Sequence, residues 1–472
     1  MKTAMEMREA LMRGEITSEE LVRESLKKIH AEDEKIGAFV EVYDDEALAA
    51  AREIDARIAR GDEVGRLAGI PVAIKDNMCH KGHKTCAGSK MLIDYVAAYD
   101  STLVHRLKSA GAIIVGRTNM DEFAMGSSTE TSYFQKTRNP IDTTKVPGGS
   151  SGGAVAAVAA GFVPIAFGSD TGGSIRQPAA LCGVVGLKPT YGRVSRFGLI
   201  AMASSLDQIG PIATTVADCA LALEAIEGRD EQDATSLDVT EKHPAELLSH
   251  SVQGIRIGVP KQAFIDGMDE GVKTKVQEAI EALKNAGATI VDLDLPLLEY
   301  GLPVYYILQP AEASSNLGRF DGMRYGTRAH VDGIWESYLT ARGDGFGREV
   351  KRRIMLGSYI LSAGYYDAYY KKALAVKTAI NESLNDAFLH VDVIVMPTSP
   401  MVAWNLGEKF DDPIAMYLAD IYTTFANICG LPGISVPCGL SQNLPVGLQF
   451  VSPRMEDGKL LDIAAAYEAI RS

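Results

Sequence analysis

Residues 147–178 read PGGSSGGAVAAVAAGFVPIAFGSDTGGSIRQP, with two turns rich in glycine and serine on either side of an apolar, alanine-rich segment. The first turn presents Ser150 and Ser151, and the second presents Ser174. Glycine lets the backbone bend sharply or approach a bound atom closely. A serine held in such a bend can act as a nucleophile while neighbouring backbone N–H groups point to the same place. The stretch therefore predicts a catalytic serine, which needs a base to activate it.

The candidate base lies upstream, in the segment LAGIPVAIKDN at 67–77. The chain has eight histidines, but none lies within either serine turn. The run Val72–Ile74 is short, partly β-branched and preceded by Pro71, which predicts a buried strand ending at Lys75. Burial lowers the pKa of a lysine and favours the neutral amine, which can serve as a general base. The alternative is a structural lysine whose head group reaches water at the end of the strand.

Lys75, the string GGSSGG at 148–153 and the string GSDTGGSIRQPA at 168–179 together resemble the amidase signature family. The resemblance implies a Lys–Ser–Ser catalytic unit, in which Ser174 is the nucleophile, Ser150 is the bridging serine and Lys75 is the base. In that unit Ser174 attacks an amide carbonyl, Ser150 accepts its proton, and Ser150 passes its own proton to the neutral lysine. The oxyanion is expected to meet the backbone N–H groups of Thr171, Gly172, Gly173 and Ser174.

Neighbouring residues are expected to hold the two turns in place. The resemblance implies a cis peptide bond between Gly149 and Ser150. Asp170 and Arg176 flank the nucleophile, and we expect them to brace its turn through a charge-assisted hydrogen bond. The alternative for this pair is a solvated ion pair. Ser151 is expected to form hydrogen bonds within its turn rather than to take part in the chemistry.

The pattern along the chain predicts an α/β fold. From 67 to 211 apolar strands alternate with glycine turns and helices, which favours a largely parallel sheet covered by helices. The amidase signature fold, implied by the resemblance, is a single large α/β/α domain with a twisted mixed sheet covered by helices on both faces. We expect residues 1–472 to form one such domain. Its parts are a helical segment at 1–62, the signature core at 67–211 and a mostly helical substrate-pocket region at 300–390.

Composition excludes several classes of protein. Hydrophobic residues make up 46% of the 472 residues and charged residues 23%, which is typical of a globular chain. The net charge of −14 argues against strong binding to a nucleic acid backbone by this chain alone. The uncharged window 146–169 is long enough to cross a membrane, but its glycines and prolines favour a buried core element, and no membrane association is expected. Six cysteines show no disulfide framework, which favours the reducing cytoplasm.

The segment CHKGHKTC at 79–86 carries four residues of types that bind zinc, namely Cys79, His80, His83 and Cys86. Their spacing matches no common zinc motif, and no second cluster lies nearby in the sequence. We therefore expect no metal site. A zinc-dependent activity that is lost on chelation would contradict this expectation.

Segments far from the serine turns narrow the resemblance to one branch of the family, the A subunits of tRNA-dependent glutamyl/aspartyl amidotransferases of the GatCAB type. The segments are MDEFAMGSSTE at 120–130, PAEASSNLGRFDGMRYG at 310–326, GFGREVKRRIMLG at 345–357 and SAGYYDAYYKKA at 362–373. The resemblance implies a glutaminase that releases ammonia for the amidation of Glu-tRNA(Gln), Asp-tRNA(Asn) or both. A B-type partner would bind the tRNA and use ATP and Mg, a small C-type partner would complete a heterotrimer, and this chain would need no cofactor.

Glutamine needs a guanidinium for its α-carboxylate and a carboxylate for its α-ammonium. The resemblance implies that Arg353 binds the carboxylate, that Asp420 binds the ammonium and that Tyr305 lines the pocket. The neighbouring Arg352 is an alternative carboxylate contact. The run KRR is also consistent with a solvated helix face.

Two other functions are compatible with parts of the sequence. A stand-alone amidase of the same family would act on a small or aryl amide, which needs neither Arg353 nor Asp420. A non-catalytic scaffold subunit would be expected to lack the nucleophile or the base, and both are present here.

Overall fold

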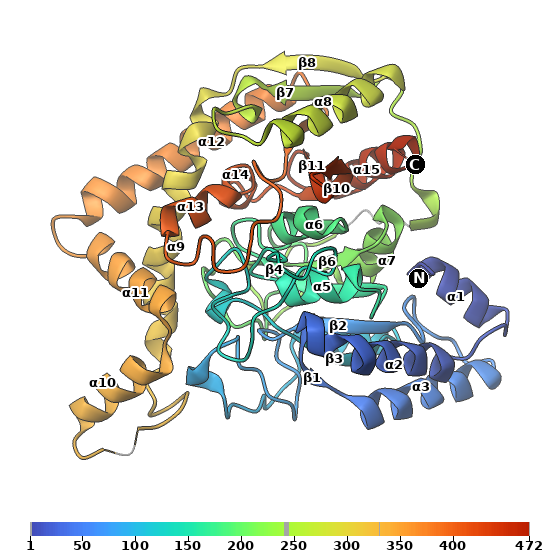
Figure 1. The fold of residues 1–472 in the computed structure, drawn as a ribbon, viewed down its shortest axis with the longest axis horizontal. Coiled ribbons are helices and arrows are strands. Elements are labelled where there is room, and N and C mark those ends of the chain that lie inside the picture. The colour runs from blue at the N-terminus through green and yellow to red at the C-terminus, as the bar shows by residue number, and fades with distance from the viewer. Residues whose placement is uncertain (1, 240–244, 330, 472) are drawn as a thin grey trace.

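The apolar run that ends at Lys75 forms strand β2, the third strand from one edge of a mixed sheet (Figure 1). The computed structural model describes residues 2–239, 245–329 and 331–471. Within these residues the sheet has eleven strands in the order β1-β3-β2-β4-β6-β5-β10-β11-β9-β7-β8. The strands are β1 (Phe39–Val42), β2 (Pro71–Lys75), β3 (Ile113–Thr118), β4 (Ile165–Asp170), β5 (Val185–Lys188), β6 (Gln208–Ala213), β7 (Arg256–Pro260), β8 (Thr289–Leu293), β9 (Val393–Pro397), β10 (Gly433–Ser441) and β11 (Leu444–Val451).

Parallel and antiparallel pairs both occur in this sheet. Strand β2 runs parallel to β3 and to β4, and β7 runs parallel to β8 and to β9. Strand β6 pairs antiparallel with β4 on one side and with β5 on the other. The antiparallel pairing continues from β5 to β10, from β10 to β11 and from β11 to β9. The expected fold class, an α/β sheet of mixed direction with helices on both faces, is confirmed.

Every side chain of β2 is buried because both faces of the sheet are covered. Val72 and Ile74 pack into one hydrophobic cluster, and Ala73 between them packs into the other. This alternation follows from the two-residue period of a strand. The same strand therefore joins both cores and holds Lys75 rigidly at its end.

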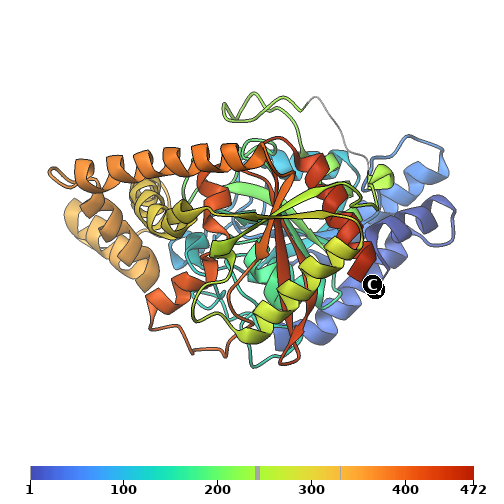
Figure 2. The same ribbon diagram turned by 90° about the horizontal axis from the view of Figure 1, so that it is seen from above.

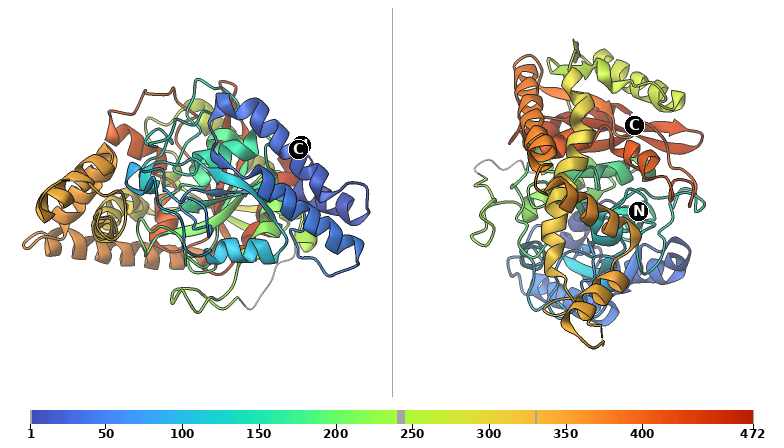
Figure 3. Two further views of the ribbon diagram at one scale, coloured as in Figure 1. Left: turned by 90° about the horizontal axis from the view of Figure 1, so that it is seen from below. Right: turned by 90° about the vertical axis from the view of Figure 1, so that its left-hand side faces the viewer.

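Helices lie on both sides of the sheet, as Figure 2 shows from the β8 edge and the left panel of Figure 3 shows from the β1 edge. The longer helices are α1 (Ala4–Met12), α2 (Ser18–Ile36), α3 (Asp44–Ala59), α4 (Thr102–Ser109), α5 (Gly152–Ala159), α6 (Arg176–Cys182), α7 (Val216–Ile226), α8 (Glu270–Asn285), α9 (Gly301–Asn316), α10 (Ile334–Gly345), α11 (Arg348–Ile360), α12 (Lys372–Phe388), α13 (Pro413–Tyr417), α14 (Thr424–Ile428) and α15 (Asp457–Arg471). The 3₁₀-helices are η1 (Lys90–Leu92), η2 (Glu122–Ala124), η3 (Ala245–Leu247), η4 (Lys261–Ala263), η5 (Pro296–Tyr300), η6 (Leu317–Arg319) and η8 (Leu418–Asp420), and η7 (Tyr366–Lys371) is a π-helix.

The N-terminal segment, expected to be helical over 1–62, holds α1, α2 and α3 and also the edge strand β1. Gly37 ends α2 in the left-handed conformation, at φ +69°, and the chain then extends along β3. A four-residue strand between two helices carries too short a pattern to stand out in the sequence. Its antiparallel pairing with β3 is a tertiary contact that extends the sheet by one strand.

Helices α9 to α12 stand together along the left side of the molecule in Figure 1 and face the viewer in the right panel of Figure 3. Helices α9 and α11 pack closely against each other, since a Cβ on Gly357 would lie 1.9 Å from the carbonyl oxygen of Pro310. This close contact fixes α11, which carries Arg353, against α9, which carries Tyr305.

Candidate active site

The two serine turns meet at the ends of neighbouring elements. Strand β4 ends at Asp170, and the turn that follows carries Ser174 into the start of α6. The first turn leads into α5, and the peptide bond between Gly149 and Ser150 is cis. The backbone N–H of Ser151 donates to the carbonyl oxygen of Ser174 at 3.1 Å, which ties the two turns together.

Lys75 lies beneath these turns and has no exposed surface. Its Nζ lies 2.8 Å from Oγ of Ser150, 2.8 Å from Oγ of Ser151 and 3.0 Å from Oγ of Ser169. A lysine whose head group reaches water is therefore excluded. Burial lowers the pKa of Lys75 to about 7, although nearby buried carboxylates, Asp121 foremost, oppose this effect. The neutral amine is thus accessible at neutral pH.

Ser174 differs from the other two serines in its exposure. Ser150 and Ser151 are completely buried, whereas Ser174 keeps 8% of its surface exposed. A nucleophile must reach the substrate and a proton bridge must not, so this difference suits the two roles expected for Ser174 and Ser150. Ser151 donates from its Oγ to the carbonyl oxygen of Ser169 at 3.0 Å, as a serine that supports the turn would.

Asp170 braces the nucleophile turn, as the sequence predicted. Its carboxylate accepts two hydrogen bonds from the Arg176 guanidinium, at 3.0 Å and 2.9 Å, and both residues are fully buried. It also accepts from the backbone N–H groups of Gly173, at 2.9 Å, and Ile175, at 3.1 Å. Burial alone would raise the pKa of Asp170, but the Arg176 charge outweighs it and holds that pKa far below its usual range. Asp170 is therefore a charged structural anchor at all working pH values.

The hydrogen bond to Asp170 changes the expected oxyanion site. The Gly173 N–H was expected to face the oxyanion, but it already donates to Asp170 and is not available. Within the described residues, the N–H groups of Thr171, Gly172 and Ser174 donate to no protein acceptor. These three are the donors that the turn can offer to a developing negative charge.

The two glycines of this turn are required by close packing. A Cβ on Gly172 would lie 2.6 Å from Cζ of Tyr305, and a Cβ on Gly173, whose φ is +133°, would lie 2.1 Å from Oγ1 of Thr423. Thr423 Oγ1 also donates to the carbonyl oxygen of Gly172 at 2.6 Å. Tyr305 therefore lies directly against the nucleophile turn, and its expected role in lining the substrate pocket stays a prediction.

Arg353 is buried, so the solvated helix face proposed for the run KRR is wrong at this position. Its Nε donates to Glu349 at 2.8 Å and its Nη1 donates to Oε1 of Gln309 at 2.9 Å. The guanidinium also lies over the rings of Tyr306 and Tyr417, at 5.2 Å and 5.3 Å from their centroids. Among the described residues, Nη2 has no acceptor. Arg353 therefore keeps free donors for an anion.

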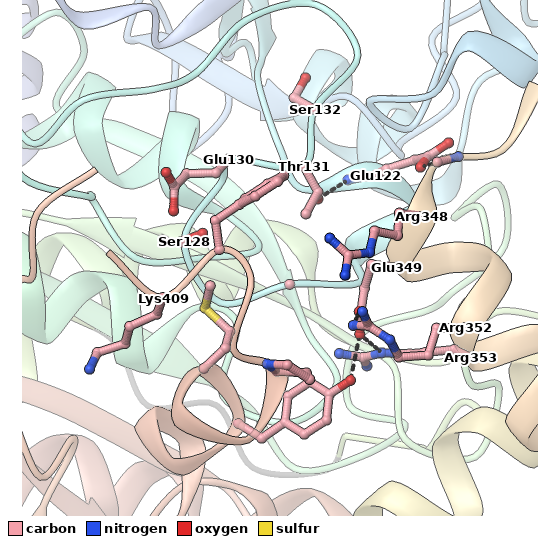
Figure 4. A pocket seen from close by; sticks show the side chains of 16 residues that line it. Glu122, Ser128, Glu130, Thr131, Ser132, Arg348, Glu349, Arg352, Arg353 and Lys409 are labelled. Atoms are coloured by element: carbon pink, nitrogen blue, oxygen red, sulfur yellow. Dashed lines mark hydrogen bonds and ion pairs between the residues drawn. The ribbon is translucent and has the colours of Figure 1, made fainter. Parts of the chain in front are cut away.

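Arg353 lines a cavity of about 290 Å³, which Figure 4 shows from close by. Arg348, Glu349 and Arg352 stand on the same wall of it, and Ser128, Glu130 and Lys409 stand on the facing wall. Arg352 is one-third exposed and bonds to Glu349 from the other side. Both arginines border the cavity, but Arg353 is the one that points into the protein.

Asp420 is mostly buried and lies in η8, which directly follows the cavity-lining helix α13, but it is not itself among the residues that line the cavity. Its Oδ2 accepts from Oγ of Ser127 at 2.5 Å, and its Oδ1 has no partner among the described residues. Burial raises the pKa of Asp420 to about 7, although Ser127 and the Arg353 charge act in the opposite direction. A buried carboxylate oxygen without a partner is costly, so this atom is suited to receive a cationic group of a ligand.

Sequence reasoning missed three residues of the site. Ser169 bonds to Lys75 and to Asn77 and so orients the base. Gln309 and Glu349 hold Arg353. Ser169 and Gln309 border apolar runs and Glu349 lies in a charged segment, and none of the three stood out without knowledge of what it faces. Ser127, in the segment 120–130, donates from its hydroxyl to Asp420.

The whole chain is similar in sequence to known proteins. The sequence model of the family described as Amidase matches residues 20–461. The A subunit of a glutamyl-tRNA(Gln) amidotransferase from Thermoanaerobacter pseudethanolicus is 53% identical over 99% of this chain and 96% of its own length. The protein of the same name from Moorella thermoacetica is 54% identical, with the same coverage.

Solved structures agree with these matches. The A subunit of the glutamyl-tRNA(Gln) amidotransferase from Thermotoga maritima is 45% identical, with a TM-score of 0.80, and the match covers 96% of this chain and 91% of the other. A bacterial aryl acylamidase of the amidase signature family has a TM-score of 0.87 at 26% identity, covering 99% and 96%. The fold is common to both, and the sequence is distinctly nearer to the amidotransferase proteins.

Proposed function

The chain belongs to the amidase family, and on that premise we propose that it is a glutamine amidohydrolase subunit. It releases ammonia from glutamine, and a partner protein uses that ammonia to amidate Glu-tRNA(Gln), Asp-tRNA(Asn) or both. The observation that carries the proposal is a buried pair of opposite charge. Arg353 lines the cavity and bonds to protein through Nε and Nη1, and Asp420 has an Oδ1 without a partner among the described residues. The names of the relatives that are more than 50% identical support it.

The proposed reaction is a relay from Ser174 through Ser150 to Lys75. Oγ of Ser174 attacks the side-chain amide carbon of glutamine, and its proton passes to Ser150 as the Ser150 proton passes to neutral Lys75. The oxyanion accepts hydrogen bonds from the N–H groups of Thr171, Gly172 and Ser174. The proton returns along the same path to the leaving nitrogen, ammonia departs, and water hydrolyses the glutamyl ester.

Substrate recognition uses the charges of the amino acid end. The α-carboxylate of glutamine accepts hydrogen bonds from the free donors of Arg353, and the α-ammonium donates to the free Oδ1 of Asp420. The ring of Tyr305 lies against Gly172 of the nucleophile turn, and neither Tyr305 nor Ser174 is among the residues that line the cavity. An aryl amide carries neither charge, and it would leave Nη2 of Arg353 and the buried Oδ1 of Asp420 without a partner.

The proposed partners follow from the surface and from the relatives. Large apolar side chains are exposed on the protruding helices α10 and α11, among them Trp335 and Leu339, which are 74% and 73% exposed, and Met355. Patches of this kind are typical of protein–protein contacts. We propose a heterotrimer with B-type and C-type subunits, in which the B-type subunit holds tRNA, ATP and Mg. The net charge of −14 agrees with tRNA binding by the partner.

The remaining proposals concern the domain organisation of the chain and its location in the cell. We propose that residues 1–472 act as one amidase domain, in which the region 300–390 forms the substrate pocket over the signature core at 67–211. The reaction belongs in the cytoplasm, where aminoacyl-tRNA is made. In the part of the chain that the structure describes, no helix is long and apolar enough to cross a membrane.

The test is a glutaminase assay on the chain purified alone and together with co-expressed partner subunits. We expect glutamate and ammonia from glutamine, and little turnover of an aryl amide such as 4-nitroacetanilide. Rapid hydrolysis of the aryl amide with no action on glutamine would assign the chain to the stand-alone amidases instead.

A further inference from the structure

Two histidines of the segment 79–86 lie against a helix that is distant in sequence. His80 and His83 stack with ring centroids 4.2 Å apart and an interplanar angle of 19°. Glu46, in the first turn of α3, reaches both rings, and its carboxylate lies 2.9 Å from Nε2 of His83 and 4.0 Å from Nε2 of His80. One ligand atom from each of the three residues lies within 4.8 Å of the other two.

His80 is buried, and no hydrogen bond within the described residues accounts for its two ring nitrogens. It is 2% exposed, and neither of its ring nitrogens has a hydrogen-bond partner among the residues that the structure describes. Buried polar atoms are nearly always satisfied by protein, water or an ion. The neighbouring Tyr43 supplies no hydrogen bond to His80. Its ring packs against both histidines, and the Tyr43 hydroxyl is also buried without a partner among the described residues.

The donor set identifies the class of ligand. Two imidazole nitrogens and one carboxylate are a common set for zinc and for similar borderline divalent ions, whereas Mg²⁺ and Ca²⁺ prefer oxygen donors alone. Cys79 and Cys86, the other candidates in this segment, do not belong to the group.

Convergence of the three ligands requires the His83 ring to turn out of its stack on His80, because an imidazole binds a metal in its own ring plane and the two planes lie 19° from parallel. Tetrahedral zinc with bonds of about 2.0–2.1 Å brings ligand atoms to roughly 3.4 Å from one another. The Glu46 side chain is about half exposed and free to turn, and the His83 ring is partly exposed at the same edge. The positive Lys108 near His80 is held by Asp100 at 2.9 Å, which reduces its repulsion of a cation.

Against the expectation of no metal site drawn from the spacing at 79–86, we propose that Glu46, His80 and His83 bind one Zn²⁺ ion, or a similar borderline divalent cation, with water completing the shell. The ion joins helix α3 to the segment that follows the base. That segment also carries Asp76, directly after Lys75, whose carboxylate accepts from the N–H groups of Cys86 and Gly88, each at 2.9 Å. Zinc would therefore stabilise the position of the loop at 79–86, which follows the proposed base Lys75, and it takes no part in the proposed hydrolysis.

The test measures zinc bound to the full chain, prepared without a histidine tag and stripped with a chelator. Titration with ZnCl₂ against a chromophoric chelator should show one tight site per chain, and MgCl₂ should not compete. Zinc should also raise the midpoint of thermal unfolding. X-ray absorption at the zinc edge should show two imidazole nitrogens among the ligands.

Glu46→Gln and His83→Asn are the decisive variants, since both side chains reach the surface and their loss leaves the fold in place. Each should weaken zinc binding by more than about 10-fold and abolish the thermal shift, while the midpoint in chelator stays near that of the parent. His390→Asn, at an exposed site beyond α12, is the matched control and should bind zinc as the parent does. A parent chain that binds no zinc at micromolar concentrations, or variants that bind it equally well, would overturn the proposal.

Discussion

The pKa of Lys75 determines how glutamine hydrolysis should depend on pH. Burial lowers that pKa to about 7, and the relay requires the neutral amine. The active fraction is then about one half at pH 7, one tenth at pH 6 and one hundredth at pH 5. The value of kcat at saturating glutamine should therefore fall about tenfold for each pH unit below pH 6.

Protonation of Asp420 should lower kcat/KM at acidic pH, in addition to the protonation of Lys75. Its pKa is raised to about 7 in the free protein, and only the carboxylate form can pair with the ammonium of glutamine. Because kcat/KM reports the free enzyme, its logarithm should approach a slope of two below pH 6. Bound glutamine keeps Asp420 charged, so kcat should keep a slope of one. Asp420→Asn should reduce the slope of kcat/KM to one.

The assay quantifies glutamate by chromatography from pH 5 to pH 9 at constant ionic strength, with circular dichroism to show that the protein stays folded. Asp386→Asn, at an exposed site on α12, is the matched control and should retain the slope of two. A kcat that stays level down to pH 5 would refute a neutral lysine as the base. A parent slope of one in kcat/KM would refute the role of Asp420.

Three substitutions test separate parts of the site. Ser174→Ala should abolish glutamine hydrolysis without changing the thermal midpoint, and turnover by this variant would remove Ser174 as the nucleophile. Asp420→Asn should raise KM for glutamine at pH 8 by about 10-fold to 150-fold, the loss of a charge-assisted hydrogen bond of about 1.5–3 kcal/mol, and an unchanged KM would exclude the ammonium contact. Gly172→Ala, whose Cβ would meet Tyr305, should lower kcat by about 100-fold, whereas Gly343→Ala, with open space around it, should not. Equal kcat values for the two alanine variants would contradict the oxyanion assignment.

The proposed catalytic residues could be picked out from the sequence because the motifs that carry the family resemblance are local. A short buried strand that ends in lysine, and serines placed in glycine turns, can each be recognised within about ten residues. The strand alternation of the core was visible for the same reason. The edge strand β1 was missed because its four residues gain their strand partner only from β3.

Residues whose roles depend on distant partners could not be assigned in this way. The burial of Arg353 follows from the packing of α11 on α9, and the run KRR alone gives no sign of it. The Gly173 N–H was expected to face the oxyanion, but it donates a hydrogen bond to the carboxylate of Asp170 instead. Glu46 is distant in sequence from the histidines that it meets, so the pattern at 79–86 does not contain the third ligand of the proposed zinc site.

The acyl-enzyme is the most direct test of the proposed relay. Glutamine is mixed with the protein, the reaction is stopped in acid within milliseconds to seconds, and peptides are mapped by mass spectrometry. The relay predicts a γ-glutamyl ester on Oγ of Ser174, which accumulates transiently and is absent from Lys75→Ala. A glutamyl adduct on Ser150 or Ser151, or rapid hydrolysis of glutamine with no adduct on any serine, would contradict it.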